Sequence, residues 1–393
     1  MKATIPLFIT IMILAGCTDQ TSNKLIHSDI LQESSPRHLV LAEIIEGEYP
    51  NIATSISDPG YDLVISYTAL ETTEGSILGL VRHCELIGDC ILISDGNSLY
   101  MFNQNGEFVW KVSNQGRGPG EYSFIGNIAV DRWRKEIIIS CSEFLHHYIY
   151  DYNGMFIEEL NLSPAIGFYV KVIDSARYLV QTGSPYANPW AWVVSKGGIV
   201  HHTFSEYNNP PKIYDDGRGS SYVSQRNIGE VLNGYYLWQS DTVWYLDRMF
   251  SAKRAILTID SRIKERESEM FHPVYQTNVS TGGKRKRHYV YDISSHNDTL
   301  FHLTYFFQKR NLLYETHRGK FYEYSAEGYN DDIDNGPPVK GLPDPHNPHT
   351  SVLYPLDILK LDPKIIRKES DLLKIFNTIK PEDNPVIRII HCR

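Results

Sequence analysis

The sequence predicts an all-β protein, a six-bladed β-propeller, and three observations indicate it. Short runs rich in Val, Ile, Tyr and Phe dominate the chain from Arg37 to His391. Turns separate these runs, and Asn105-Gly106 and Asn153-Gly154 supply the positive φ angles that two-residue hairpins need. Similar segments recur roughly every 45 to 55 residues, a period typical of propeller blades with several strands each.

The clearest repeat consists of the segments 91–108 and 137–156, whose Asn-Gly turns lie 48 residues apart. Each contains a continuous apolar strand, a polar turn, an aromatic strand and the Asn-Gly turn. Weaker copies follow, and a seventh blade drawn from 50–70 is the alternative count. We expect six blades, near residues 76–112, 124–162, 168–204, 222–259, 286–318 and beyond 350.

Single strands without a partner in the repeats stand at both ends of this region. One is His38–Ile44 and the other is Pro385–His391. Lys368–Ile379, just before the second strand, has the apolar spacing of a short C-terminal helix. We expect the N- and C-terminal strands to pair in one blade, because that pairing closes the ring and leaves no open sheet edge.

Residues 1–16 have the features of an export signal. The apolar run Ile5–Leu14 follows Lys2, and as a helix it covers roughly half of a bilayer's hydrocarbon core, too little to span it. Leu14-Ala15-Gly16-Cys17 resembles the lipobox of bacterial lipoproteins, and the resemblance implies lipidation of Cys17 and cleavage before it. A plain secretory signal is the alternative. Residues 17–36 then form a polar tether, and residues 37–393 form the propeller domain.

The charge balance of the chain bears on its partners. The formal net charge is −9, and no broad basic surface is encoded, so we expect no nucleic-acid partner. The one basic run, Lys284–His288, fits a solvated hairpin loop.

Four cysteines follow Cys17, and export would place them in an oxidising compartment. Cys84 and Cys90 flank Gly88-Asp89, so a tight hairpin would bring them together as a candidate disulfide. Free buried thiols are the alternative.

Gly116-Arg117-Gly118-Pro119-Gly120-Glu121-Tyr122 is the most distinctive stretch of the chain. Its glycines and proline fix an unusual backbone path, and we take Arg117, Glu121 and Tyr122 as candidate ligand-binding residues. The alternative is a crossover between blades in which Arg117 and Glu121 form a structural ion pair. The stretch is not a phosphate loop, because it lacks both G-x-G-x-x-G and the Lys-Ser/Thr ending.

Together with the segments 128–131 and 383–386, the glycine-rich stretch resembles the six-bladed β-propeller lipoproteins that are abundant in Bacteroidetes. The resemblance covers most of the mature chain. It implies the propeller fold and a cell-envelope location, as an outer-membrane lipoprotein facing the periplasm or the surface. It implies no catalytic residues.

Other polar motifs give little indication of chemistry. His146-His147 and His201-His202 are adjacent pairs, and neighbours on a strand point to opposite faces, so we expect no metal site. Asp131, Asp151 and Asp247 each follow an apolar or aromatic strand, and we expect them to bond backbone amides in turns. No motif predicts a cofactor, and no G-x-S-x-G elbow is present.

The sequence therefore favours a non-catalytic binding or interaction module, held at the membrane by its lipid anchor. A glycan, a peptide or another envelope protein would be its ligand. The alternative is a propeller enzyme, a lyase or hydrolase, with its active site at the central channel.

Overall fold

The computed structural model describes residues 37–40, 55–58, 60, 62–118, 120–141, 146–182, 189–205, 213–215, 221–223, 228–231, 234–238, 242–251, 253–260, 291–295, 300–305, 310–315, 319–324, 328–341 and 348–393.

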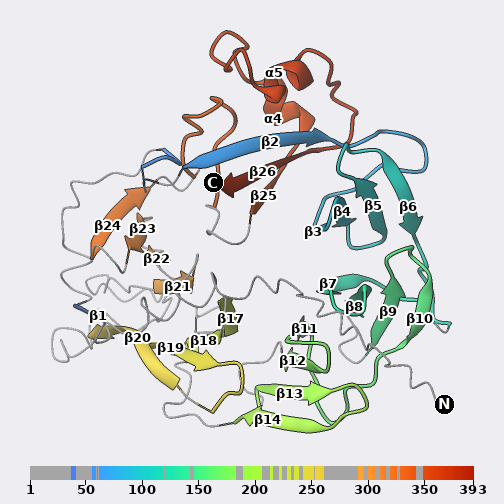
Figure 1. Cartoon of the computed structure of the whole chain (residues 1–393), viewed down its shortest axis with the longest axis vertical. Coiled ribbons are helices and arrows are strands. Elements are labelled where there is room, and N and C mark those ends of the chain that lie inside the picture. The colour runs from blue at the N-terminus through green and yellow to red at the C-terminus, as the bar shows by residue number, and fades with distance from the viewer. Residues whose placement is uncertain are drawn as a thin grey trace, which may run out of the picture.

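Five antiparallel blades follow one another around a ring (Figure 1). Blade 1 consists of β3 (His83–Ile87), β4 (Cys90–Ser94), β5 (Leu99–Asn103) and β6 (Phe108–Val112). Blade 2 consists of β7 (Ile125–Asp131), β8 (Glu136–Cys141), β9 (His147–Asp151) and β10 (Phe156–Glu159). Blade 3 consists of β11 (Tyr169–Val172), β12 (Arg177–Gln181), β13 (Ala191–Ser195) and β14 (Val200–Phe204).

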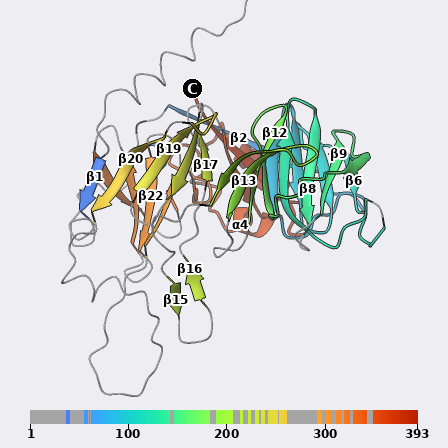
Figure 2. The ribbon, with the colours of Figure 1, turned by 90° about the horizontal axis from the view of Figure 1, so that it is seen from below.

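The second half of the ring repeats this plan. Blade 4 consists of β17 (Ile228–Val231), β18 (Gly234–Trp238), β19 (Thr242–Asp247) and β20 (Lys253–Asp260), with β1 (Arg37–Val40) added beside β20. Blade 5 consists of β21 (Tyr291–Ser295), β22 (Leu300–Tyr305), β23 (Arg310–Glu315) and β24 (Lys320–Tyr324). A separate hairpin of β15 (Ile213–Asp215) and β16 (Ser221–Val223) projects from the ring (Figure 2).

A three-stranded sheet, which we call the closing sheet, stands between blade 5 and blade 1 (Figure 1). It consists of β2 (Leu63–Ala69), β26 (Val386–Cys392) and β25 (His349–Leu353), with β26 in the centre.

The prediction of a six-bladed ring, closed by the strand at 38–44, is wrong. Only five sheets have four or more strands in the described chain, and the closing sheet has three. The N-terminal strand β1 pairs in parallel with β20, and β2 takes its place beside β26. Residues 63–69 join that sheet, so they do not start a seventh blade either. The physical reason is that any open sheet edge can pair with an apolar strand through its free backbone groups. The apolar pattern of residues 38–44 therefore does not determine which sheet edge the strand joins.

Asn384, in the segment 383–386, fastens the closing sheet to the start of blade 1. Its side-chain amide donates to the carbonyl oxygens of Glu71 and Ser76 at 2.7 and 2.8 Å. Its Oδ1 accepts the backbone N–H of Leu78 at 2.9 Å. A buried amide satisfied in this way fixes the entry of the chain into β26.

Packing between blades follows the two-residue alternation of the strands. In β8, Ile137 and Ile139 face blade 1, whereas Ile138 faces blade 3. The middle strands are buried on both faces for this reason, which explains their continuous apolar sequence. Hairpins form at the Asn-Gly turns, but the predicted two-residue geometry is wrong. In these turns only Gly106 and Gly154 have positive φ, and backbone hydrogen bonds close three-residue loops between 103 and 107 and between 151 and 155. A side chain at Gly106 would place Cβ 2.0 Å from the carbonyl oxygen of Ala69.

Two short helices cover the closing sheet: α4 (Pro355–Leu359) and α5 (Asp371–Phe376). The predicted C-terminal helix is present as α5, which begins after Ser370; the Ser370 hydroxyl accepts the N–H of Leu372 at 3.1 Å. Leu372 packs with Tyr67 of β2 in one apolar cluster. None of the helices that the structure describes has the length and apolar character needed to cross a membrane.

Candidate functional site

The connections between blades define one face of the ring. Strands alternate in direction within each blade, so the β6–β7 crossover (113–124) and the β10–β11 crossover (160–168) emerge on the same face. We call it the crossover face. The β7–β8 and β11–β12 hairpin turns lie on the opposite side, which we call the turn face.

The glycine-rich stretch is the β6–β7 crossover, and it folds around a carboxylate. Oε2 of Glu121 accepts the backbone N–H of Gly118 at 2.7 Å. A Cβ on Gly116 would lie 1.9 Å from the same oxygen, so the absent side chain there makes room for the carboxylate. Glu121 is thus held in place by the loop's own backbone.

The other two predicted ligand residues have different surroundings. Tyr122 is 2% exposed, belongs to the core between blades 1 and 2, and donates its hydroxyl to the carbonyl oxygen of Val112 at 3.1 Å. Burial raises the pKa of Tyr122. Arg117 is exposed on the crossover face. Glu121 is exposed as well, so Arg117 and Glu121 have side chains that a ligand could reach, whereas Tyr122 does not.

An open cleft of about 480 Å³ lies beside the β10–β11 crossover. This size is typical of small-ligand sites. Its lining comes from the start of β9, the end of β10 and the crossover itself: His147, Glu159, Leu160, Asn161, Leu162, Ser163, Ala165 and Ile166. The sequence does not reveal this site, because its residues come from three elements. The His146-His147 pair was the only signal for it.

His147 is the most buried titratable group at the cleft, with 4% of its surface exposed. It faces Ser140 across the β8–β9 pair, and Nδ1 of His147 lies 2.9 Å from Oγ of Ser140. Burial, helped by the neighbouring His146, lowers the pKa of His147 to about 4. The imidazole is therefore neutral at ordinary pH.

The two adjacent histidine pairs behave as strand alternation predicts. His146 points outward, where Nδ1 lies 2.6 Å from Oε1 of Glu159, while His147 points inward. In β14, Nε2 of His201 lies 2.5 Å from Oγ of Ser195, and His202 stacks on Phe250. Among the residues that the structure describes, no group of three or more His, Cys, Asp or Glu side chains is placed to hold a metal ion.

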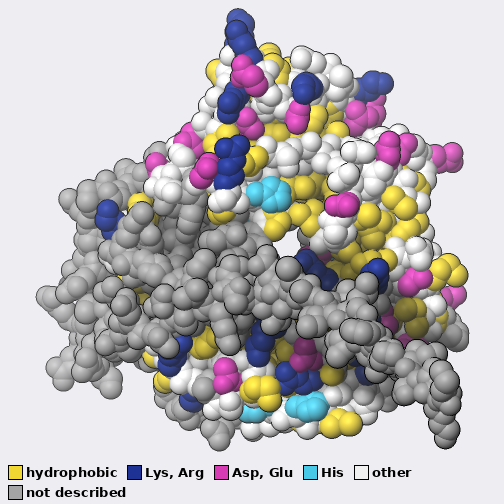
Figure 3. Space-filling view, in the orientation of Figure 1, with side chains coloured by type: hydrophobic (Ala, Val, Ile, Leu, Met, Phe, Trp, Pro, Cys, Tyr) yellow, Lys and Arg dark blue, Asp and Glu magenta, His cyan; other side chains and the backbone are white. Residues whose placement is uncertain are grey.

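The axis of the ring is lined by the inner strands β3, β7, β11 and β25 (Figure 1). Figure 3 shows an opening at the centre of the molecule, with basic side chains beside it. The charge of Lys171 in β11 acts on the carboxylate of Glu85 in β3, although the two residues belong to blades 3 and 1. This interaction is possible because the inner strands converge at the axis. Burial raises the pKa of Glu85, and Arg132 and Lys171 act in the opposite direction.

Polar side chains near the axis bond the backbone of the next blade. Nε2 of His83 donates to the carbonyl oxygen of Gly126 at 3.2 Å. The amide of Asn127 donates to the carbonyl oxygen of Val170 at 3.3 Å. These bonds join blades 1, 2 and 3, so these side chains build the channel wall.

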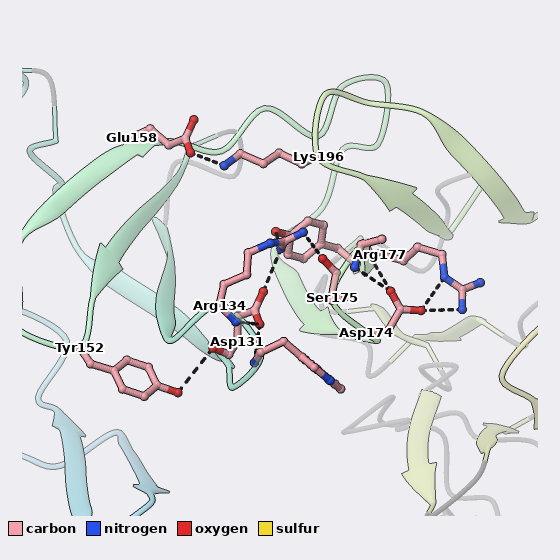
Figure 4. A network of polar contacts seen from close by, with 11 residues as sticks. Asp131, Arg134, Tyr152, Glu158, Asp174, Ser175, Arg177 and Lys196 are labelled. Carbon is pink, nitrogen blue, oxygen red and sulfur yellow. Dashed lines mark hydrogen bonds and ion pairs between the residues drawn. The ribbon is translucent and has the colours of Figure 1, made fainter. Parts of the chain in front are cut away.

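Arginines join the blades at the turn face (Figure 4). Arg134 pairs with Asp131 in its own turn at 2.9 Å and donates across to the carbonyl oxygen of Ser175 in blade 3. Arg177 repeats this arrangement with Asp174 at 2.7 Å and reaches the carbonyl oxygen of Arg248 in blade 4.

The predicted role of the turn aspartates is confirmed. Oδ1 of Asp131 accepts the N–H of Arg134 at 2.9 Å. Oδ1 of Asp151 accepts the N–H of Met155 at 2.8 Å, and Oδ1 of Asp247 accepts the N–H of Ser251 at 2.9 Å.

The candidate disulfide is absent, and both cysteines are free thiols. Cys84 packs on the side of blade 1 that faces the closing sheet, whereas Cys90 packs on the side that faces blade 2. Their positions in the hairpin also differ, since Cys90 pairs with Ile87 and Cys84 pairs with Ile93. Thiols on opposite faces of a sheet cannot bond. Cys17 and Lys284–His288 lie outside the described residues.

Comparison with solved structures identifies the fold. The chain is similar to a Bacteroides fragilis NCTC 9343 protein whose name describes it as exported, with 17% identity over 84% of this chain and 95% of that chain and a TM-score of 0.59. Weaker likenesses include U3-55K (10% identity, 82% of this chain and 98% of that chain, TM-score 0.38) and the WD40 domain of Neurospora crassa Pan2 (8% identity, 63% and 66%, TM-score 0.37).

No curated protein matches the sequence. A family model does match it, over residues 62–391, from the residue before β2 to the penultimate residue of β26. The chain therefore belongs to the family described as a domain of unknown function, DUF4934.

Proposed function

We propose that this protein is an exported, lipid-anchored β-propeller that binds a ligand on its crossover face without changing it chemically. The observation that supports this most is the cleft beside the β10–β11 crossover. It is open to solvent, and it brings together a neutral imidazole, a carboxylate and an amide: His147, Glu159 and Asn161. Convergent polar groups on a partly apolar wall are typical of ligand sites.

The Ser140–His147 pair is the observation that would favour an enzyme, since a serine beside a histidine can act as a nucleophile. Two facts weigh against that role. Ser140 is 1% exposed, so a substrate could not reach its hydroxyl. The hydroxyl also faces Nδ1, whose partner in serine hydrolases is the orienting carboxylate. The pair supports a role for Ser140 in orienting the imidazole at the cleft.

Export and anchoring are supported by the N-terminal sequence. The apolar run before Leu14-Ala15-Gly16-Cys17 fits a lipoprotein signal, and the similar Bacteroides fragilis protein bears a name that describes export. Several acyl chains on Cys17 would hold the protein stably, since one chain gives only marginal membrane binding. The anchor would leave the ring free to engage an envelope or extracellular ligand.

Membrane fractionation tests the anchor. The Cys17→Ala variant should leave the membrane pellet for the soluble fraction, whereas Cys392→Ala, the matched control, should pellet like the wild type. Membrane retention of Cys17→Ala would contradict the proposal.

Ligand binding is tested with the purified mature chain on arrays of glycans and peptides. We expect a saturable ligand whose mass is unchanged after long incubation. Ser140→Ala should still bind it, but more weakly, because the imidazole of His147 loses the hydroxyl that orients it. Arg117→Ala should weaken binding only if the ligand extends from the cleft to the glycine-rich loop. Turnover of the ligand that stops in Ser140→Ala would instead establish the enzyme.

A further inference from the structure

We infer that the cleft beside the β10–β11 crossover binds an uncharged sugar unit of a glycan. The inference rests on the proposed function and names its ligand class and contact residues. It follows from the charge, the hydrogen-bonding groups and the apolar surface of the cleft.

The charge of the lining argues against anionic ligands. Among the lining residues that the structure describes, Glu159 is the one carboxylate, and none is Lys or Arg. His147 carries no compensating charge near neutral pH, because burial holds its pKa at about 4. A phosphate, a sulfate or a peptide carboxylate would meet a negative group without a cation to balance it.

The polar groups fit hydroxyls, which both donate and accept. Oε1 of Glu159 is engaged by His146, which leaves Oε2 to accept a hydroxyl hydrogen. Oδ1 of Asn161 accepts the N–H of Ser163 at 3.0 Å, so the amide NH₂ remains as a donor. Nδ1 of His147 faces Ser140, which leaves Nε2 for the ligand.

Ile166 supplies the apolar part of the site. Its side chain lines the cleft and is 57% exposed, so a ligand can pack against it. A pyranose ring has one face of C–H groups, and an exposed aliphatic side chain beside hydroxyl-binding groups fits that ring. An extended peptide would instead use an open strand edge or an aromatic groove. Most of the lining comes from a crossover, which offers no strand edge.

The experiment compares neutral oligosaccharides with their uronic acid and sulfated counterparts, and with peptides, on one array with the purified mature chain. Neutral glycans should bind at least tenfold more tightly than their acidic counterparts. Ile166→Asp should weaken that binding by at least tenfold. Ile199→Asp is the matched control, because Ile199 is 64% exposed and lies outside the cleft.

A second pair of variants tests the hydrogen bonds. Glu159→Gln should weaken neutral glycans, whereas Glu158→Gln, its neighbour in β10, should not; Glu158 pairs with Lys196 and does not line the cleft. Thermal melts of each variant confirm that it folds, and the substituted residues other than Glu158 are exposed.

The outcomes separate this inference from the proposed function. If the protein binds peptides but no glycan, and Ile166→Asp abolishes that binding, the inference of a sugar ligand is wrong while the proposed binding function stands. Glycan binding that is unaffected by Ile166→Asp and Glu159→Gln overturns the cleft as the site. A preference for acidic glycans overturns the charge argument. If neither glycans nor peptides on the array bind, both the inference and the proposed function are wrong.

Discussion

Nη1 of Arg388 in β26 lies 3.8 Å from Oδ2 of Asp331, and both side chains are shielded from solvent. The same oxygen of Asp331 accepts the hydroxyl of Tyr67 in β2 at 3.0 Å. Arg388 also donates to the carbonyl oxygens of Pro337 and Pro338, at 2.5 and 3.0 Å. This buried cluster fastens the loop before the closing sheet to two of the sheet's strands.

Replacing Arg388 with Met should lower the free energy of unfolding by about 3–5 kcal/mol, because it leaves the buried Asp331 carboxylate without its cation and two carbonyl oxygens without their donor. Chemical denaturation measures this change. Lys374→Met is the control, since Lys374 forms an exposed ion pair with Asp371 and its loss should matter little. Equal effects of the two substitutions would contradict the role of the cluster.

The sequence predicted the local structure well where turn chemistry decides it. The helix after Ser370 and the turn aspartates form as expected. Hairpins also form at 105–106 and 153–154, with positive φ at the glycines only. Blade number and closure could not be predicted, because the choice between 37–40 and 63–69 as the partner of β26 depends on which edge lies nearby. That information is not local.

The candidate site was predicted less well for a similar reason. Tyr122 follows a glycine-rich loop, and pattern alone does not show whether an aromatic there faces the core or a ligand. Its burial follows from packing between two blades. His147, Glu159 and Ile166 meet only because the crossover folds back over blade 2, and no spacing in the sequence encodes that contact.

Stability should fall below neutral pH because of His147. Above pH 6.5 neither the folded nor the unfolded state protonates it, so it has no effect. Between pH 6.5 and about 4 only the unfolded state takes up the proton, which lowers the free energy of unfolding by up to about 3 kcal/mol. His349, whose pKa burial also lowers to about 4, acts in the same direction.

Urea unfolding at pH 7.5 and 4.5 checks this prediction. His147→Gln should lose less stability between the two pH values than the wild type, by about 2 kcal/mol. His391→Gln is the control, because His391 is exposed. A wild-type pH dependence in His147→Gln would show that this histidine is not buried in neutral form.

Cys84 should be unreactive in the native protein. Burial, with a smaller contribution from Glu85, raises the pKa of its thiol to about 12, so almost no thiolate forms at pH 8. Thiol titration of the mature chain without reductant should count four free thiols in denaturant, and mass spectrometry should find Cys84 unlabelled in the native state. A denatured count of two would indicate a disulfide.

Arg134 should stabilise the contact between blades 2 and 3 through geometry and not through charge alone. Its guanidinium pairs with Asp131 at 2.9 Å, donates to the Tyr178 hydroxyl at 2.5 Å and to the Ser175 carbonyl oxygen, and lies 5.6 Å from the centre of the Tyr178 ring. Three partners in fixed directions suit a planar fork of donors, which lysine lacks.

Arg134→Met should therefore lower the free energy of unfolding by about 2 kcal/mol, and Arg134→Lys should recover less than half of that loss. Arg132→Met is the control, because Arg132 is exposed and makes one bond of 3.3 Å to Leu86. Hydrogen exchange gives a second readout: the amides of the turn at 173–176 should exchange faster in Arg134→Met, since that turn loses its contact with blade 2. Full recovery by Lys would show that charge suffices, and unchanged exchange in the turn would show that the blades are held together elsewhere.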